Sequence, residues 1–128
     1  MIAEAVLCLA LNIYFEARSE DFKSQIAVGQ VTLNRVESEK FPDTICEVVK
    51  QRNQFSWFWD DKSDVPYEKQ AWKDSLALAK MFLEDHRIEV ECVSDATHYH
   101  ADYVRPRWRK AFDRYCKVGK HIFYKDNT

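Results

Sequence analysis

The sequence contains few of the residues that interrupt regular structure. Only two glycines and three prolines occur among 128 residues, which argues against long flexible linkers. It contains no internal repeat and no low-complexity segment. The longest apolar run, from Ala3 to Ala17, is too short and too close to charged residues to span a bilayer. Met1 to Glu4 lacks the basic start of a signal peptide, so action outside the cytoplasm would need another route of delivery.

The composition is that of one folded unit with an uneven charge. Hydrophobic residues make up 46% and aromatic residues 14%, so we expect residues 1–128 to form a single domain with a sizeable core. Residues 1–100 carry 11 Lys and Arg against 18 Asp and Glu, whereas residues 101–128 carry 8 against 3. The basic end could meet an anionic polymer such as nucleic acid, lipid headgroups or wall glycan, or it could be a solvated face.

The apolar segment from Ala3 to Ala17 predicts a central helix that is buried on most sides. Glu16 lies near its C-terminal end. Poor solvation by apolar neighbours and the negative end of the helix dipole both favour a protonated carboxyl there. A protonated carboxyl is what a general acid needs. The alternative is a structural glutamate paired with Arg18 or a nearby lysine at the rim of the core.

Periodicity and capping signals predict three further helices, over residues 22–37, 45–51 and 67–85. Asp21 can cap the first of them, and Thr44 with Glu47 forms a capping box for the second. Gly29 falls on the apolar stripe of helix 22–37, which begins at Phe22, and would let another helix approach closely. Residues 92–100 predict extended chain, 105–115 a short helix, and 117–124 a closing strand that pairs with the first. The expected fold class is α+β, mainly α, with a small antiparallel sheet.

The four cysteines have no CxxC spacing and allow three pairings. The expected disulfides join Cys92 with Cys116 and Cys8 with Cys46, which would suit an oxidising compartment. The alternative is four buried thiols that behave as small hydrophobic residues.

An aromatic segment follows the third predicted helix. Four of the five residues from Phe55 to Trp59 are aromatic, and a helix cannot bury them all on one side. Some of these rings are expected to line a surface groove, the alternative being that they fold back into the core. Aromatic faces suit the apolar face of a pyranose ring, and Asn53, Gln54 and Ser56 could bind hydroxyl or N-acetyl groups.

A protonated glutamate beside such a groove is the general acid of glycosidic cleavage. No second carboxylate is singled out among Glu20, Asp60, Asp61, Asp64, Asp95 and Asp102. This pattern favours a mechanism with one glutamate. Glu16 would protonate the leaving oxygen and then accept a proton from a hydroxyl of the same sugar.

Two other classes of function, a zinc site and a nucleic-acid-binding segment, each have some support in the sequence. His98 and His100 would share one face of a strand, where Cys92, Asp102, Cys116 or His121 could complete a zinc site. An HxH pair alone is a weak signal, so no metal or other cofactor is expected. The basic C-terminal segment lacks a recognition helix and an RNP-like strand, so no nucleic-acid partner is expected.

Six segments carry motif residues in a fixed order: Ile13–Glu20, Gln25–Val36, Phe41–Ile45, Gln54–Ser56, Ala96–His100 and Val118–Tyr124. In that order they resemble the cell-wall hydrolase family of the spore-cortex-lytic (SleB-type) enzymes. The resemblance implies a lysozyme-like catalytic domain related to lytic transglycosylases. It also implies cleavage of peptidoglycan between N-acetylmuramic acid and N-acetylglucosamine. The family's catalytic glutamate falls on Glu16.

The candidate substrate-binding residues follow from the resemblance and from the groove: Gln54, Phe55, Ser56, Trp57, His98, Tyr99 and His100. The expected partner is peptidoglycan, bound by a monomer on the periplasmic or extracellular side of a bacterium. Spore enzymes usually carry a signal peptide and a wall-binding domain. Neither is expected here, so the chain resembles a phage endolysin more closely. The alternatives are a hydrolytic muramidase with a second carboxylate, a zinc-dependent wall hydrolase, and a glycan-binding module without activity.

Overall fold

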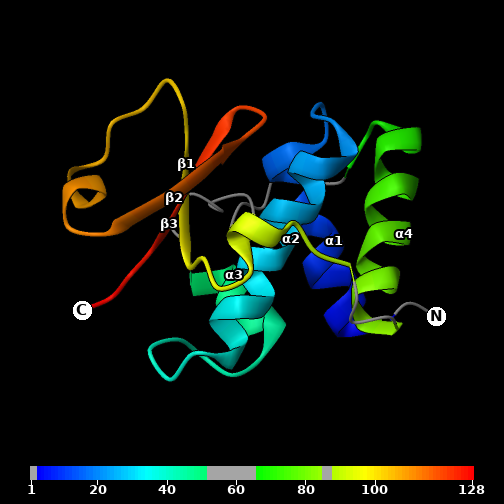
Figure 1. Cartoon of the computed structure of the whole chain (residues 1–128). Coiled ribbons are helices and arrows are strands. Elements are labelled where there is room, and N and C mark those ends of the chain that lie inside the picture. Colours follow the sequence, from blue (N-terminus) through cyan, green and yellow to red (C-terminus); the bar gives the residue numbers. More distant parts are fainter. Residues whose placement is uncertain (1–2, 52–65, 85–87) are drawn as a thin grey trace.

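The computed structural model describes residues 3–51, 66–84 and 88–128, and within them four α-helices stand beside a three-stranded antiparallel sheet (Figure 1). The helices are α1 (Glu4–Ala17), α2 (Phe22–Glu37), α3 (Ile45–Gln51) and α4 (Lys69–Glu84). The strands are β1 (His98–Ala101), β2 (Asp113–Val118) and β3 (His121–Lys125). The α+β, mainly helical class is therefore confirmed. No helix of these three ranges has the length and apolar character needed to cross a membrane.

Helix α1 is the central helix, as its apolar sequence predicts. It contacts α2, α3 and α4, and Leu9, Ala10 and Ile13 are fully buried. These side chains form one core cluster with Leu78, Ala79 and Phe82 of α4. Burying a large aliphatic side chain contributes about 1.5–3 kcal/mol, so this cluster is a main source of stability.

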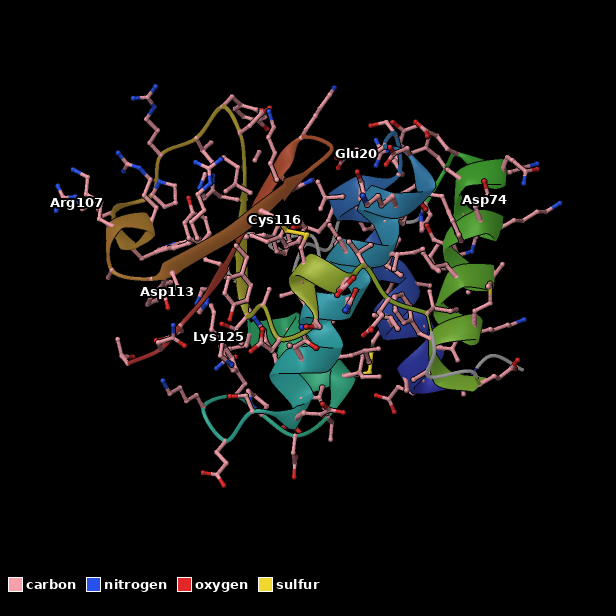
Figure 2. The ribbon with its side chains drawn as sticks, viewed as in Figure 1. Glu20, Asp74, Arg107, Asp113, Cys116 and Lys125 are labelled. Atoms are coloured by element: carbon pink, nitrogen blue, oxygen red, sulfur yellow. A yellow bond between two sulfur atoms is a disulfide. The ribbon has the colours of Figure 1, made fainter. Side chains whose placement is uncertain are left out.

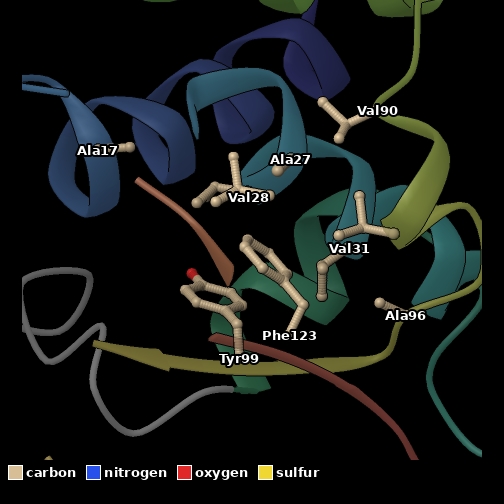
Figure 3. Packing of buried hydrophobic residues seen from close by; sticks show 10 residues of the cluster. Ala17, Ala27, Val28, Val31, Val90, Ala96, Tyr99 and Phe123 are labelled. Carbon is tan, nitrogen blue, oxygen red and sulfur yellow. The ribbon is translucent and has the colours of Figure 1, made fainter. Parts of the chain in front are cut away.

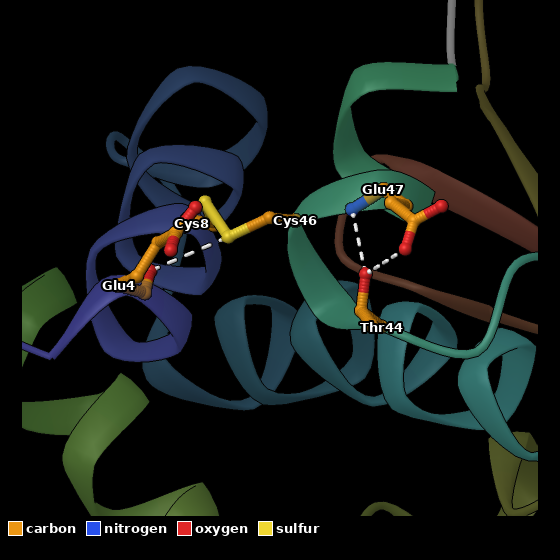
Figure 4. Close-up of a disulfide and its surroundings, with 5 residues drawn as sticks. All are labelled: Glu4, Cys8, Thr44, Cys46 and Glu47. Carbon is orange, nitrogen blue, oxygen red and sulfur yellow. Dashed lines mark hydrogen bonds between the residues drawn. A yellow bond between two sulfur atoms is a disulfide. The ribbon is translucent and has the colours of Figure 1, made fainter.

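The helix starts follow the predicted caps. The Asp21 carboxylate accepts a hydrogen bond from the Ser24 backbone N–H at 2.9 Å, directly before α2. The Thr44 hydroxyl accepts from the Glu47 backbone N–H at 3.2 Å and donates to the Glu47 carboxylate at 2.9 Å (Figure 4). The carboxylate thus binds the Thr44 hydroxyl and not the backbone N–H that a full capping box would use.

Two disulfides tie distant segments together, with the pairs expected from the sequence. Cys8–Cys46 joins α1 to α3 (Figure 4). Cys92–Cys116 joins a 3₁₀ turn, Glu91–Val93, to strand β2.

The predicted inward stripe of α2 is only partly correct. Gly29 is buried, and a Cβ atom there would lie 2.7 Å from Phe82 Cε2 and 3.2 Å from Ile13 Cδ1, so the side chains of two neighbouring helices pack directly against it. The placement of Phe22 on the inward face is wrong, because its side chain is 56% exposed. Polar residues of α2, Gln30, Thr32 and Arg35, are buried instead, since they bind α1 and the segment before the sheet.

The sheet has the order β1-β3-β2, with β3 in the middle. The predicted pairing of the closing strand with the first is confirmed by the register Tyr99 to Phe123. Its predicted start at residue 117 is wrong, because Lys117 and Val118 end β2 and a turn at Gly119 leads into β3. The prediction of extended chain from residue 92 is wrong, because Glu91–Val93 is a 3₁₀ turn and β1 begins at His98. The helix predicted over 105–115 is also wrong. Only Arg107–Lys110 forms a 3₁₀ turn, and pairing with β3 draws Asp113–Val118 into strand β2.

One face of the sheet packs on α2 and on the end of α1. Tyr99 and Phe123 point from the strands toward Ala17, Val28 and Val31 of the helices (Figure 3). The Tyr99 and Phe123 rings stack with centroids 5.5 Å apart. This second core cluster holds β1 against the C-terminal end of α1.

Gly29→Val tests the packing of the Phe82 ring of α4 against Gly29 of α2. The added methyl groups would overlap Phe82, so we expect the free energy of unfolding to fall by about 1–3 kcal/mol in a denaturant titration. Ala77→Val, on the exposed side of α4, is the control for the lower helix propensity of valine. Equal, small losses in both variants would contradict the packing described for Gly29.

Candidate active site

Polar side chains of α2 hold the segment that leads into β1. The Asn34 amide donates to the carbonyls of Val93 at 3.0 Å and Ala96 at 2.8 Å. Arg35 Nε donates to the Thr97 carbonyl at 2.6 Å, and Gln30 Oε1 accepts from the Val90 N–H at 2.8 Å. These bonds satisfy backbone groups of a non-helical segment that is partly buried, and they determine where β1 begins.

Strand β1 in turn places Tyr99 against Glu16. The Tyr99 ring is 4% exposed, and its hydroxyl donates a hydrogen bond to Glu16 Oε1. Glu16 is half-buried in the last turn of α1. Its other carboxyl oxygen, Oε2, makes no hydrogen bond with another described residue. The tyrosine therefore orients the carboxyl group and leaves one oxygen available.

A cleft of about 620 Å³ lies between the end of α1 and the sheet. Its described lining comes from α1, β1, β3 and the loop between β1 and β2. The lining residues are Phe15, Glu16, Tyr99, His100, Ala101, Tyr103, Val104, Arg105, Pro106, Trp108 and His121. Glu16 is the one carboxylate among them, and it lies beside aromatic rings and hydrogen-bonding groups.

The structural alternative for Glu16 is wrong as far as Arg18 is concerned. Arg18 Nε pairs with the Glu68 carboxylate at 3.4 Å, and its guanidinium lies over the Tyr14 ring at 4.8 Å. Arg18 is therefore directed to the start of α4 and not to the cleft. Tyr99 is the hydrogen-bond partner that the structure assigns to Glu16.

The other candidate carboxylates in the described ranges are not among the residues that line the cleft. Glu20 bonds to His121 Nδ1 at 3.0–3.1 Å and accepts the Lys120 N–H at 3.2 Å. Asp102 pairs with Lys117 at 3.1 Å, and Asp95 lines a separate surface depression. Asp60, Asp61 and Asp64 lie outside the described residues. The described walls thus supply one acid–base carboxyl group.

His121 is a cleft residue that the sequence analysis considered only as a zinc ligand. Its ring packs edge-on against Tyr99, with centroids 5.2 Å apart, and Glu20 holds its Nδ1. The available signal was that Glu20 and His121 each lie in a motif segment, Ile13–Glu20 and Val118–Tyr124. Their pairing across 101 positions of sequence could not be read from either segment alone.

The two histidines of β1 do share one face, as predicted. Both face Trp108, at centroid distances of 5.2 Å for His98 and 5.6 Å for His100. His98 packs among Phe41, Trp108 and Phe112 and is not among the cleft-lining residues, whereas His100 lines the cleft and bonds through Nε2 to the Tyr124 hydroxyl at 2.8 Å.

The zinc alternative loses two of its proposed ligands. Cys92 and Cys116 are joined to each other in a disulfide. In residues 3–51, 66–84 and 88–128 no three His, Cys, Asp or Glu side chains form a cluster that could hold a metal ion. Of the remaining candidates for the groove, Gln54, Phe55, Ser56 and Trp57 lie outside the described residues.

A half-buried glutamate oriented by a tyrosine in an aromatic-walled cleft defines a class of site, that of an acid–base catalyst acting on a polar, ring-containing substrate. The sequence pattern of the Cell Wall Hydrolase family matches residues 19–124. The chain belongs to this family. Glu16 precedes the matched range, so its role rests on the site geometry and on the motif around it.

Curated relatives are spore cortex-lytic enzymes. The chain is 30% identical to that of Oceanobacillus iheyensis over 118 residues, which cover 91% of this chain and 40% of the relative. It is 24% identical to that of Bacillus subtilis over 126 residues, covering 90% of this chain and 35% of the relative. The chain thus spans well under half the length of these curated relatives.

Solved structures match over almost the whole chain. The catalytic domain of the germination-specific lytic transglycosylase SleB from Bacillus anthracis superposes with a TM-score of 0.73 at 27% identity, covering 97% of both chains. The catalytic domain of the Bacillus cereus SleB protein gives a TM-score of 0.70 at 27% identity, covering 98% of this chain and 93% of that one. The fold is that of the SleB catalytic domain.

Asn34→Asp tests the attachment of the segment before β1 to α2. The aspartate has the same shape but cannot donate to the carbonyls of Val93 and Ala96, so we expect a loss of about 2 kcal/mol in the free energy of unfolding. Gln51→Glu, the same amide-to-carboxylate change at an exposed position of α3, should cost about 0.5 kcal/mol or less. Similar losses for both would show that the Asn34 bonds contribute little.

Proposed function

We propose that the chain is a peptidoglycan lytic transglycosylase in which Glu16 is the catalytic acid and base. The observation that carries the proposal is the Glu16 carboxyl group, the one carboxylate among the described cleft-lining residues, oriented by Tyr99. The likeness to the SleB catalytic domain, a lytic transglycosylase, supports the same reaction class. The substrate would be the glycan strand, cut between N-acetylmuramic acid and N-acetylglucosamine.

The chemistry needs one proton donor that becomes an acceptor. Glu16 gives its proton to the bridging oxygen as the bond from that oxygen to C1 of the muramic acid breaks, and positive charge develops on the sugar. The Glu16 carboxylate then takes the proton of the C6 hydroxyl of the same sugar as that oxygen bonds to C1. The product is a 1,6-anhydro sugar, no water is consumed, and Glu16 regains its proton.

The remaining assignments follow from this function. Residues 1–128 would act as one catalytic domain, without a metal or other cofactor. The protein would work as a monomer on the bacterial wall, at the periplasmic or extracellular face, as a phage endolysin does. Gln54, Phe55, Ser56 and Trp57 would add to the substrate groove formed by Tyr99 and His100, whereas His98 would support that groove through Trp108.

Glu16→Gln keeps the shape of the side chain and removes the proton that it transfers. We expect turnover of purified peptidoglycan to fall by about 100- to 10,000-fold, with an unchanged unfolding transition. Mass spectrometry of the soluble products should give anhydro-muramyl ends from the wild type. Glu84→Gln, an exposed change on α4, is the control and should retain full activity.

Three other outcomes would contradict the proposal in whole or in part. Reducing muramic acid ends would mean that water attacks and that a second carboxylate must be sought. An active Glu16→Gln variant would remove Glu16 from the mechanism. No products from the wild type, with binding to the wall intact, would favour a glycan-binding module.

Tyr99→Phe keeps the stacked ring and removes the hydroxyl group that donates to Glu16. We expect kcat to fall about tenfold with little change in KM, because the bond orients the carboxyl group and does not bind substrate. Tyr115→Phe is a matched control, since this tyrosine lies on β2, is exposed and is not among the cleft-lining residues. Equal kcat values in the two variants would show that Tyr99 has no special role.

A further inference from the structure

Basic side chains gather at one edge of the cleft. Arg105, Arg107 and Lys110 lie on the loop between β1 and β2, and Arg114 lies at the start of β2. All four are exposed, and none has an ion-pair partner among the described residues. We call these four residues the basic edge. Figure 2 shows Arg107 at the outer margin of the molecule, on the opposite side from Asp74 of α4.

The loop that carries the basic edge is anchored to the sheet. The Trp108 ring packs against Tyr124 at 5.2 Å and Phe112 at 5.4 Å, and it also contacts both histidines of β1. The Arg109 backbone N–H donates to the Pro106 carbonyl at 3.2 Å and closes the 3₁₀ turn, and its guanidinium donates to the same carbonyl at 3.1 Å. The packed tryptophan anchors the backbone that carries the neighbouring cations, so on binding only their side chains need to be ordered.

The basic edge continues the wall of the cleft. Tyr103, Val104 and Arg105 line the cleft, and Tyr103 is 83% exposed. Arg107 follows two residues later. A polymer whose sugar ring lies beside Glu16 could therefore extend along Tyr103 and present its substituents to the basic edge without leaving the surface.

We propose that the basic edge binds the carboxylates of the peptide stems that project from the same glycan strand. This inference rests on the proposed function, since it takes peptidoglycan as the polymer in the cleft. In intact peptidoglycan the lactyl carboxyl group of muramic acid is amide-linked to the stem, so the backbone offers arginine no charged partner. Each peptide stem carries free carboxylates, which guanidinium groups bind in pairs of hydrogen bonds. The chain would thus prefer peptidoglycan with free stem carboxylates to peptidoglycan in which they are blocked.

Charge distribution supports a role in substrate recognition and not only in solubility. Residues 1–100 are acidic as a group, so the cations of residues 101–128 are concentrated on the sheet side, where the cleft opens. A local excess of positive charge beside a cleft attracts and orients an anionic polymer.

The test measures binding without cleavage, in a Glu16→Gln background. The loop variant is Arg107→Gln/Lys110→Gln/Arg114→Gln, which leaves the cleft residue Arg105 intact. The matched control is Lys69→Gln/Lys73→Gln/Lys80→Gln, which removes the same charge from exposed positions on α4. Binding is measured by co-sedimentation with teichoic-acid-free peptidoglycan sacculi, and again with sacculi whose carboxyl groups have been converted to amides.

We expect the loop variant to bind native sacculi about tenfold more weakly than the control variant. Amidated sacculi should bind the unmodified basic edge as weakly as native sacculi bind the loop variant. Added salt should weaken the binding of the control variant more than that of the loop variant. Coincident thermal unfolding curves would show that both variants are folded.

Four results would overturn the proposal. The first is equal binding of loop and control variants to native sacculi, and the second is undiminished binding to amidated sacculi. The third is a difference that appears only on walls that retain teichoic acid, which would point to phosphate. The fourth is a loop variant that binds duplex DNA more weakly than the control variant does, in a parallel binding assay, but binds sacculi equally well. Because cleavage is not measured, charge-dependent binding would persist even if the wild type released no anhydro products, so the two proposals fail separately.

Discussion

The position of the whole sheet depends on hydrogen bonds from α2 to the backbone of one short segment. Residues 90–97 make only a few backbone hydrogen bonds, most of them around the 3₁₀ turn Glu91–Val93, so several of their buried polar groups need side-chain partners. Asn34 and Arg35 supply them for Val93, Ala96 and Thr97, and Gln30 binds Val90. The next residues enter β1, and Tyr99 then reaches Glu16. The hydrogen bonds from α2 to this segment thus act, through β1 and Tyr99, on the orientation of the Glu16 carboxyl group.

Local patterns predicted the helices well because the information was local. The apolar run of α1 and the caps at Asp21 and Thr44 act within a few residues of where they are read. The inward face of α2 was predicted less well. Hydrophobic periodicity cannot show that Gln30 and Arg35 are buried, since their partners are carbonyls 60 and 62 positions away. Burial of these polar groups follows from tertiary hydrogen bonding and not from the helix period.

Local sequence patterns were also insufficient to predict the second strand of the sheet and the contacts within the site. Asp113–Val118 contains charged and aromatic residues that suit several structures, and only pairing with β3 makes it a strand. Glu16 could be chosen from its helix, but Tyr99 gained its role only when β1 was placed above α1. The Glu20–His121 pair needed two distant segments to meet, and the motif residues around each gave no indication of the other. Family resemblance singled out Glu16, and the three-dimensional contacts show which other motif residues lie around it.

The two halves of the cleft come from opposite parts of the chain, and this has a consequence for folding. Glu16 and Tyr99 are 83 positions apart, and Glu20 and His121 are 101 positions apart. Contacts between such distant positions are costly in loop-closure entropy and form only when most of the chain is already ordered. An intermediate with folded helices but no docked sheet would hold Glu16 without Tyr99, His121 or the cleft walls. Lytic capacity would thus appear last, at the final step of folding, so an incompletely folded chain inside the producing cell would be harmless to its wall.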